Sequence, residues 1–138
     1  MSDYQTRFGG IARLYGQTQA KWLDKAHFCV VGIGGVGTWA AEALARSGVG
    51  RISLIDLDDI CTTNTNRQIH ALTGTVGRAK VDVMAERILG INPECQVHCI
   101  EDFISQDNLV EVLGTMVEPK FDLVIDAIDS IGPKTAMI

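Results

Sequence analysis

The stretch over residues 30–56, VVGIGGVGTWAAEALARSGVGRISLID, limits what this chain can fold into more than any other part of it. An apolar run ends in a glycine-rich turn, a segment rich in small helix-forming residues follows, and a second apolar run ends on Asp56. The glycines of the turn are Gly32, Gly34, Gly35 and Gly37. This order is typical of a strand–turn–helix–strand unit that holds a nucleotide phosphate on a helix N-terminus. We therefore expect a nucleotide site at this turn.

Strand and helix patterns alternate along the rest of the chain. Apolar runs predict strands over residues 27–32, 51–56, 95–100 and 121–126, and helices are predicted over residues 36–47, 77–90 and 106–117. Such alternation favours parallel strands with right-handed crossovers, which gives an α/β fold with a doubly wound, mostly parallel, Rossmann-like sheet.

The sequence also gives expectations for the two ends of the chain. Residues 1–10 are polar and predict an arm, and residues 11–25 carry helical spacing, so residues 1–26 are expected to form an N-terminal helical arm. Residues 27–138 are expected to form the nucleotide-binding domain. Its final residues, PKTAMI, predict the first turns of a helix, which favours a domain truncated at its C-terminus.

Composition excludes several classes of protein. The formal net charge of −5 argues against a dominant basic face. No apolar stretch approaches the ~20 residues of a membrane span, and the opening MSDYQTRFGG lacks a hydrophobic signal region. We therefore expect a cytoplasmic protein without a membrane span.

The site residues are predicted to meet at one edge of the sheet, because ligands of doubly wound sheets lie beyond the carboxyl ends of the strands. The glycine turn, Asp56 and Asp129 all fall at that edge. The long polar stretch over residues 57–75 follows the second strand and contains Asn64 and Arg67. Polar stretches of this length commonly bind a ligand.

Two nucleotides fit this pattern. A glycine turn with an acid at the next strand end is the usual signature of NAD, with Asp56 on the ribose hydroxyls, but no hydride-acceptor site is identifiable. ATP chemistry needs cations for the phosphates and an acid for Mg²⁺. Arg67, Lys80 and Asp129 supply these groups. ATP is therefore favoured, and an NAD-dependent oxidoreductase remains an alternative.

Five segments resemble the ThiF/HesA/MoeB adenylyltransferases, which are themselves similar to ubiquitin-activating enzymes. The segments are GIGGVG, LIDLDDI, TNTNRQ, VGRAK and DAIDS, in matching order and spacing. The longer segments RFGGIARLYG, TNTNRQIHAL and DAIDSIGPK resemble one branch of that family, the tRNA threonylcarbamoyladenosine dehydratases. That branch uses ATP to activate the carboxylate of a threonylcarbamoyl group on tRNA, and the acyl-adenylate then closes into a ring with release of AMP.

The resemblance also implies roles for single residues. Gly34 and its neighbours would bring the backbone close to ATP, and Asp56 would hold the ribose. Asn64 and Arg67 would contact the phosphates. Lys80 would bridge phosphate oxygens as charge develops, and Asp129 would coordinate Mg²⁺. Arg67, Lys80 and Asp129 are therefore the expected catalytic residues.

The expected partners follow from the same resemblance: tRNA, a second copy of the chain in a homodimer, and a sulfur-transfer protein. Many members carry an RxxR pattern in the arm that reaches the partner's ATP, but here Gly10 stands three residues after Arg7, where the second arginine would be. Arg7 or Arg13 is left as the candidate for that contact. Two further functions therefore stay open: adenylation of a ubiquitin-like sulfur-carrier protein, and a non-catalytic nucleotide-binding module.

Overall fold

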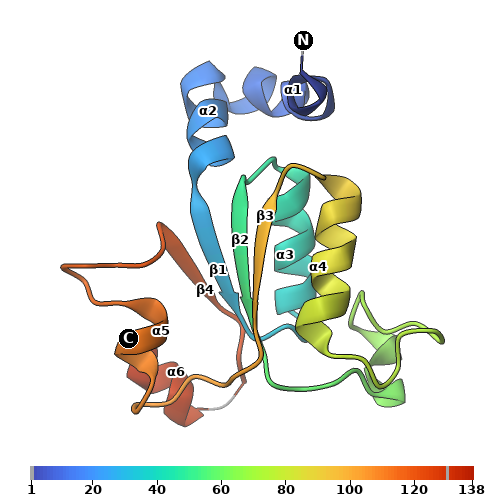
Figure 1. Ribbon diagram of the computed structural model, residues 1–138, viewed down its shortest axis with the longest axis vertical. Helices are drawn as coiled ribbons and strands as arrows, with labels where there is room; N and C mark the ends of the chain where they lie inside the picture. Colours follow the sequence, from blue (N-terminus) through green and yellow to red (C-terminus); the bar gives the residue numbers. More distant parts are fainter. Residues whose placement is uncertain (1, 130) are drawn as a thin grey trace.

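The four apolar runs form one parallel sheet with helices on both faces, which confirms the predicted α/β fold (Figure 1). The computed structural model describes residues 2–129 and 131–138. The strands are β1 (His27–Val31), β2 (Arg51–Ile55), β3 (Gln96–Ile100) and β4 (Leu123–Asp126), in the order β3-β2-β1-β4. Val31 at the end of β1 pairs in register with Ile55 of β2 and Asp126 of β4, so these carboxyl ends lie side by side.

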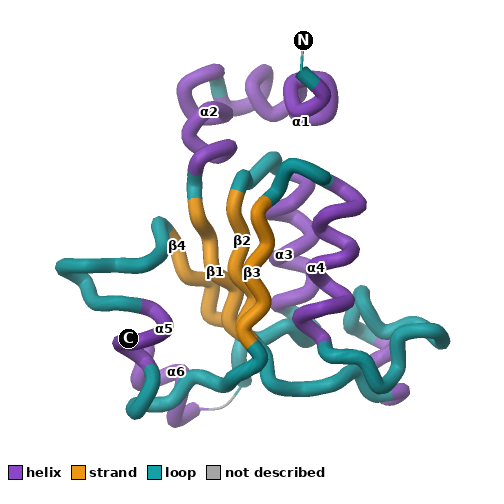
Figure 2. The backbone as a smooth tube through the Cα atoms, viewed as in Figure 1, coloured by secondary structure: helices purple, strands orange, loops and turns teal. Residues whose placement is uncertain are grey.

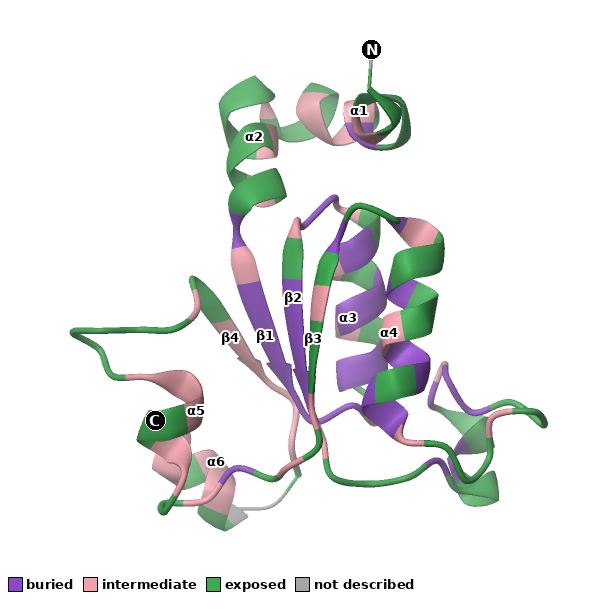
Figure 3. Ribbon diagram, viewed as in Figure 1, coloured by how far each residue is buried: buried purple, intermediate pink, exposed green. Residues whose placement is uncertain are grey.

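Two helices on one face of the sheet enclose the larger core. They are α3 (Gly37–Arg46) and α4 (Lys80–Ile91), and Figure 3 shows their inner surfaces buried against β1 and β2. Val30, Ile52 and Leu54 are fully buried there. The short helices α5 (Leu109–Leu113) and α6 (Ile131–Met137) lie on the other face, over a smaller apolar cluster.

The expected N-terminal helical arm is confirmed, but its helix begins at Asp3, within residues 1–10 and well before the helical spacing that starts at residue 11. Helix α1 (Asp3–Tyr15) is capped by Ser2, and α2 (Gln17–Lys25) follows after a break at Gly16, which has φ of +100°. Both helices lie beyond the amino ends of the strands (Figure 1). The Tyr4 hydroxyl donates to the carbonyl of Gly48 at 2.5 Å, and Phe8 is buried, so α1 packs on the sheet domain.

Two predicted helices differ in extent. The helix expected over residues 106–117 is confined to α5, because Gly114 turns the chain with φ of +81°. The helix expected from residue 77 begins only at Lys80, and the polar stretch before it holds a short 3₁₀ helix, η1 (Thr62–Asn66). Figure 2 shows this long loop at the carboxyl ends of the strands. The final residues are helical, as expected. Within the described ranges, no helix has the length and apolarity that crossing a membrane requires.

Candidate functional site

Almost all of the predicted site residues surround one cleft at the carboxyl edge of the sheet. The cleft has a volume of about 840 Å³, which lies within the usual range for small-molecule sites. The predicted residues that line it are Gly32, Gly34, Gly35, Asp56, Asn64, Arg67, Lys80 and Asp129. Gly37 does not line it and instead supports the turn from behind.

The glycine turn brings α3 directly against the end of β1. Gly32 has φ of +92°, and a Cβ there would lie 2.8 Å from the carbonyl oxygen of Ala127. A Cβ on Gly37 would lie 1.6 Å from the carbonyl oxygen of Gly32. Only glycine therefore allows this approach, which presents the N-terminus of α3 to the cleft. That end of a helix favours an anion.

Asp56 fastens the glycine turn to the loop after β2. Its Oδ2 accepts the backbone N–H of Ile33 at 2.7 Å, and its Oδ1 accepts the N–H of Asp58 at 2.8 Å. Each carboxylate oxygen can accept a second hydrogen bond, so these contacts leave room for the predicted contact with a ribose. The structural task of Asp56 has no signal in the sequence.

Asn64 and Arg67 are held by the turn around η1. The Oδ1 of buried Asn64 accepts the N–H of Cys61 at 2.8 Å, which leaves its amide nitrogen as the group that can donate to a ligand. The guanidinium of Arg67 donates to the carbonyl of Thr63 at 3.2 Å and to Oδ1 of Asn66 at 2.8 Å. The hydrocarbon part of Arg67 lies over Gly35, where a Cβ would meet it at 3.5 Å.

Lys80 is the most unusual residue of the cleft. It is the first residue of α4, only 7% of its surface is exposed, and its backbone N–H donates to the carbonyl of Asp58 at 3.1 Å. Among the residues that the structure describes, its ammonium group takes part in no ion pair. Buried lysines are normally paired with an anion. The site therefore offers an unpaired positive charge to a ligand.

The acids after β4 have separate roles. Asp126 pairs with Lys134 at 2.8 Å, which makes it a structural acid. Asp129 is exposed and lines the cleft. In the described part of the chain, no three His, Cys, Asp or Glu side chains gather closely enough to hold a metal ion. A metal at Asp129 would need further oxygen ligands from a bound molecule.

The wall of the cleft that faces the glycine turn was not predicted from the sequence. It is formed by residues 102–104 in the loop after β3 and by Pro133 of α6, while Leu57 after β2 and Ile128 after β4 complete the lining. Phe103 is 58% exposed and Ile104 is buried. The only local signal is the apolar pair Phe103 and Ile104, separated from the third strand by two residues, and it does not distinguish a ligand-facing side chain from a core residue.

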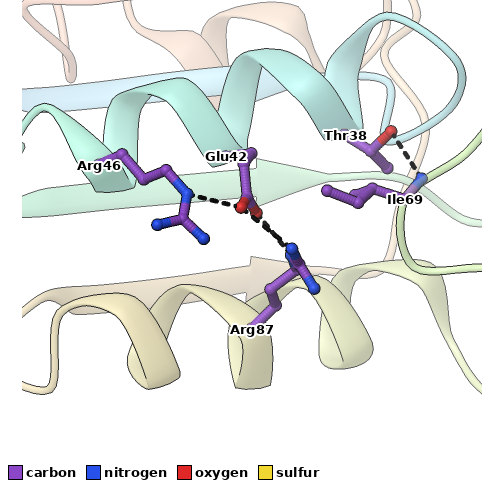
Figure 4. Close-up of polar contacts among 5 residues, drawn as sticks. All are labelled: Thr38, Glu42, Arg46, Ile69 and Arg87. Atoms are coloured by element: carbon purple, nitrogen blue, oxygen red, sulfur yellow. Dashed lines mark hydrogen bonds and ion pairs between the residues drawn. The ribbon is translucent and has the colours of Figure 1, made fainter.

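Helices α3 and α4 are tied together behind the site by Glu42 (Figure 4). This carboxylate accepts hydrogen bonds from Nε of Arg46 at 2.8 Å and from Nε of Arg87 at 2.5 Å. Burial by itself would raise the pKa of Glu42, but the hydrogen bonds from Arg87 and Arg46 prevail and lower it below its ordinary value. The ion pair fixes the helix that starts at the glycine turn against the helix that starts at Lys80.

Comparison with known proteins identifies relatives along nearly the whole chain. The ThiF family model matches residues 8–137. A protein of Escherichia coli K12 named tRNA threonylcarbamoyladenosine dehydratase is 58% identical over 135 residues, which cover 98% of this chain and 49% of that protein. A crystal structure of the E. coli dehydratase in complex with ATP has a TM-score of 0.94 at 58% identity and covers 99% of this chain and 55% of that one.

A more distant relative carries a different name. A Drosophila willistoni protein named adenylyltransferase and sulfurtransferase MOCS3 is 31% identical over 112 residues, which cover 81% of this chain and 23% of that protein. The chain thus spans about half the length of the dehydratase relatives that it matches. Because the family model extends over most of the chain, from α1 to α6, the chain belongs to the ThiF family.

Proposed function

We propose that this chain is the nucleotide-binding part of an ATP-dependent enzyme that adenylates a carboxylate, with threonylcarbamoyladenosine in tRNA as the substrate. Lys80 carries the proposal, because it is buried without an ion pair among the described residues and lines the same cleft as the glycine turn and Arg67. A triphosphate is the ligand that uses two cations and a helix N-terminus together. The name of the 58% identical E. coli relative supports the choice of substrate.

The cleft fits ATP along its whole length. The glycine turn, Arg67 and Lys80 form an end suited to phosphates. Asp56 retains acceptor capacity for the ribose hydroxyls. Phe103 and Ile104 give the opposite end an apolar surface suited to the adenine ring. The E. coli relative whose crystal structure contains ATP supports this choice of nucleotide.

The chemistry follows from bringing two anions together. The substrate carboxylate attacks the α-phosphorus of ATP, a new P–O bond forms, and pyrophosphate leaves with the electron pair of the broken bond. Arg67 and Lys80 offset the negative charge that gathers at the phosphates, and positioning in the cleft supplies most of the remaining catalysis. The acyl-adenylate then closes into a ring and releases AMP. One carboxylate oxygen leaves with AMP, so the net reaction is a dehydration.

Asp129 is the proposed Mg²⁺ ligand. This ion is commonly held by one or two carboxylates together with phosphate oxygens and water, so a three-acid cluster is not required. When bound, Mg²⁺ would neutralise phosphate charge. Asp129 itself would supply a carboxylate oxygen to the metal from the lining of the cleft.

A homodimer and a cytoplasmic location belong to the same proposal. Helix α1, which carries Arg7 and Arg13, lies at the end of the sheet remote from the chain's own cleft (Figure 1). An arginine of α1 that contacts ATP would therefore reach the cleft of a second copy. tRNA and a sulfur-transfer protein remain the proposed partners.

The decisive experiment measures AMP release by the full-length protein. We expect ATP-dependent release of AMP with tRNA that carries threonylcarbamoyladenosine, and none with tRNA that lacks the modification. Fluorescence titration with NADH and ATP is the companion measurement. Tight NADH binding without ATP binding would reject adenylation in favour of an oxidoreductase.

Adenylation of a ubiquitin-like sulfur-carrier protein is the second candidate, supported by the 31% identical adenylyltransferase and sulfurtransferase. AMP release that needs such a carrier and ignores tRNA would move the assignment there. ATP binding without AMP release for any acceptor would instead favour a non-catalytic nucleotide-binding module.

A further inference from the structure

Gln68 places a buried carboxamide in the cleft without giving it a partner. The residue is only 7% exposed and lines the cleft beside the glycine turn. Its Nε2 lies 3.5 Å from the point that a Cβ on Gly34 would occupy. Its Oε1 is buried and has no hydrogen-bond partner among the described residues. The side chain is therefore directed at the turn and bonded to nothing described there.

The backbone on either side of Gln68 is fixed to helix α3. The indole Nε1 of Trp39 donates to the carbonyl of Arg67 at 3.0 Å. The N–H of Ile69 donates to the hydroxyl of Thr38 at 3.4 Å, a contact drawn in Figure 4. Gln68 itself donates its N–H to the carbonyl of Asn64 at 3.0 Å. The backbone that carries Gln68 is therefore fixed beside the turn before any ligand arrives.

A hydrogen bond from His70 joins the segment that carries Gln68 to the glycine turn. His70 is almost fully buried, and its Nε2 lies 2.8 Å from the carbonyl oxygen of Ile33. Burial lowers the pKa of His70 and favours the neutral ring. Neutral imidazole with the proton on Nε2 donates to this carbonyl, so the segment that carries Gln68 and the glycine turn form one bonded unit.

Packing alone does not account for this choice of side chain. Burial of a carboxamide without hydrogen bonds is unfavourable, and a methionine of similar length would fill the same space without that cost. Asn64 shows the contrast, because its Oδ1 already accepts the N–H of Cys61. The Nε2 of Gln68 lies beside Gly34 and donates to no described residue, so it is the donor that remains available to a ligand in the cleft.

We infer that Gln68 is a further phosphate-binding residue of this site. Its side-chain Nε2–H donates to a phosphate oxygen that lies on the glycine turn. The inference rests on the proposed function, since it takes ATP as the ligand. The location beside Gly34 at the N-terminus of α3 selects an anion, and a neutral amide adds a donor there without adding charge.

The test compares Gln68→Glu and Gln68→Met in the full-length protein. Both variants keep the approximate size of the side chain, and the first places an anion where the phosphate would lie. Binding of ATP, AMP and adenosine is measured by calorimetry, with adenosine followed by ligand-observed NMR. Gln96→Glu is the matched control, because Gln96 is an exposed glutamine at the amino end of β3, away from the cleft.

We expect Gln68→Met to weaken ATP binding about tenfold, as for the loss of one hydrogen bond to a charged group, and Gln68→Glu to weaken it further. Adenosine binding should stay within about twofold of the wild type, and Gln96→Glu should bind ATP normally. Unchanged ATP binding by both Gln68 variants would overturn the inference while leaving the proposed function intact. Equal loss for ATP and adenosine, with a lowered melting temperature, would also overturn it by assigning Gln68 to structure. Failure of the wild type to bind ATP would reject both proposals.

Discussion

The two walls of the cleft are built in different ways. The turn-side wall consists of the glycine turn, Asp56, Asn64, Arg67, Gln68 and Lys80, and hydrogen bonds with Asp56 and α3 hold it together. The opposite wall consists of residues 102–104 with Asp129 and Pro133, and it rests on the short helices α5 and α6. The first wall presents fixed polar groups. The second presents an exposed aromatic ring and an exposed acid.

This difference indicates that the two walls have separate functions in charge stabilisation and base binding. Groups that stabilise developing charge must be oriented before the reaction, because reorganising them during it would raise the barrier. A base-binding surface needs only an apolar area of suitable shape. We therefore expect substitutions in the turn-side wall to cost much more than substitutions in the opposite wall.

Lys80→Met gives the sharpest test of the turn-side wall. The variant keeps the length of the side chain and removes the charge, so AMP release should fall about a hundredfold, or about 3 kcal/mol of transition-state stabilisation. Lys21→Met, on exposed helix α2, is the control and should retain full activity. Single-turnover kinetics provide the measurement. If Lys80→Met released AMP within about twofold of the wild-type rate, the turn-side wall would not be the more sensitive of the two walls.

Asp56→Asn should have the next largest effect. An asparagine has one acceptor oxygen in place of two, so one of the hydrogen bonds from Ile33 and Asp58 is lost and the turn loosens. We expect ATP to bind about tenfold or more weakly and the free energy of unfolding to fall by about 1–2 kcal/mol.

Asp122→Ala is the matched control for that variant, because it removes the one acceptor that Asp122 supplies. Its carboxylate accepts the N–H of His27 at 2.8 Å at the amino end of the sheet. It should lower stability without weakening ATP binding, as measured by urea unfolding and calorimetry. Equal effects of both variants on ATP affinity would show that Asp56 acts only through general stability.

Glu42→Gln tests the support behind the turn-side wall. The pKa of Glu42 lies below its ordinary value of 4.5 in the folded protein. The ion pair therefore stabilises the fold fully above that value, and its contribution is lost as the pH falls through the lower folded pKa. At pH 7 we expect the free energy of unfolding of the variant to be lower by about 1–2 kcal/mol. The expected loss is no larger because both arginines are partly exposed and solvent screens their charges.

The measurement is urea unfolding as a function of pH. The difference between Glu42→Gln and the wild type should shrink in acid, below the ordinary glutamate range. Glu86→Gln is the control, because Glu86 pairs with Arg78 on the exposed surface and should matter less. A difference that stays constant down to strongly acidic pH would contradict the role of the Glu42 charge.

Phe103→Ala should have the smallest effect, and it tests the opposite wall. The ring is 58% exposed, so its loss should weaken adenosine and ATP binding by the same small factor, about fourfold, as for about 0.8 kcal/mol of aromatic contact. Val110→Ala on α5 is an exposed control that does not line the cleft. An effect on ATP as large as that of Lys80→Met would reverse the ranking of the two walls.

Local patterns predicted the central architecture well. The apolar runs before Gly32 and Asp56 are buried strands, and the glycine turn opens α3. The periodicity of apolar residues and the residue types of a turn are local properties, so they can be read directly from the sequence. The N-terminal segment was harder to predict, because the break between α1 and α2 depends on one glycine, and Phe8 gains its burial from distant parts of the chain.

The strand–helix alternation, the position of the glycine turn and the residue types beyond the sheet can all be read from the sequence, because each depends on neighbouring residues. The folded chain was needed to show that Lys80 is buried without an ion pair among the described residues, that Asp56 holds the turn, and that Gln68 lies beside Gly34. Burial and hydrogen-bond satisfaction depend on contacts between segments far apart in the chain, and no local pattern encodes such contacts.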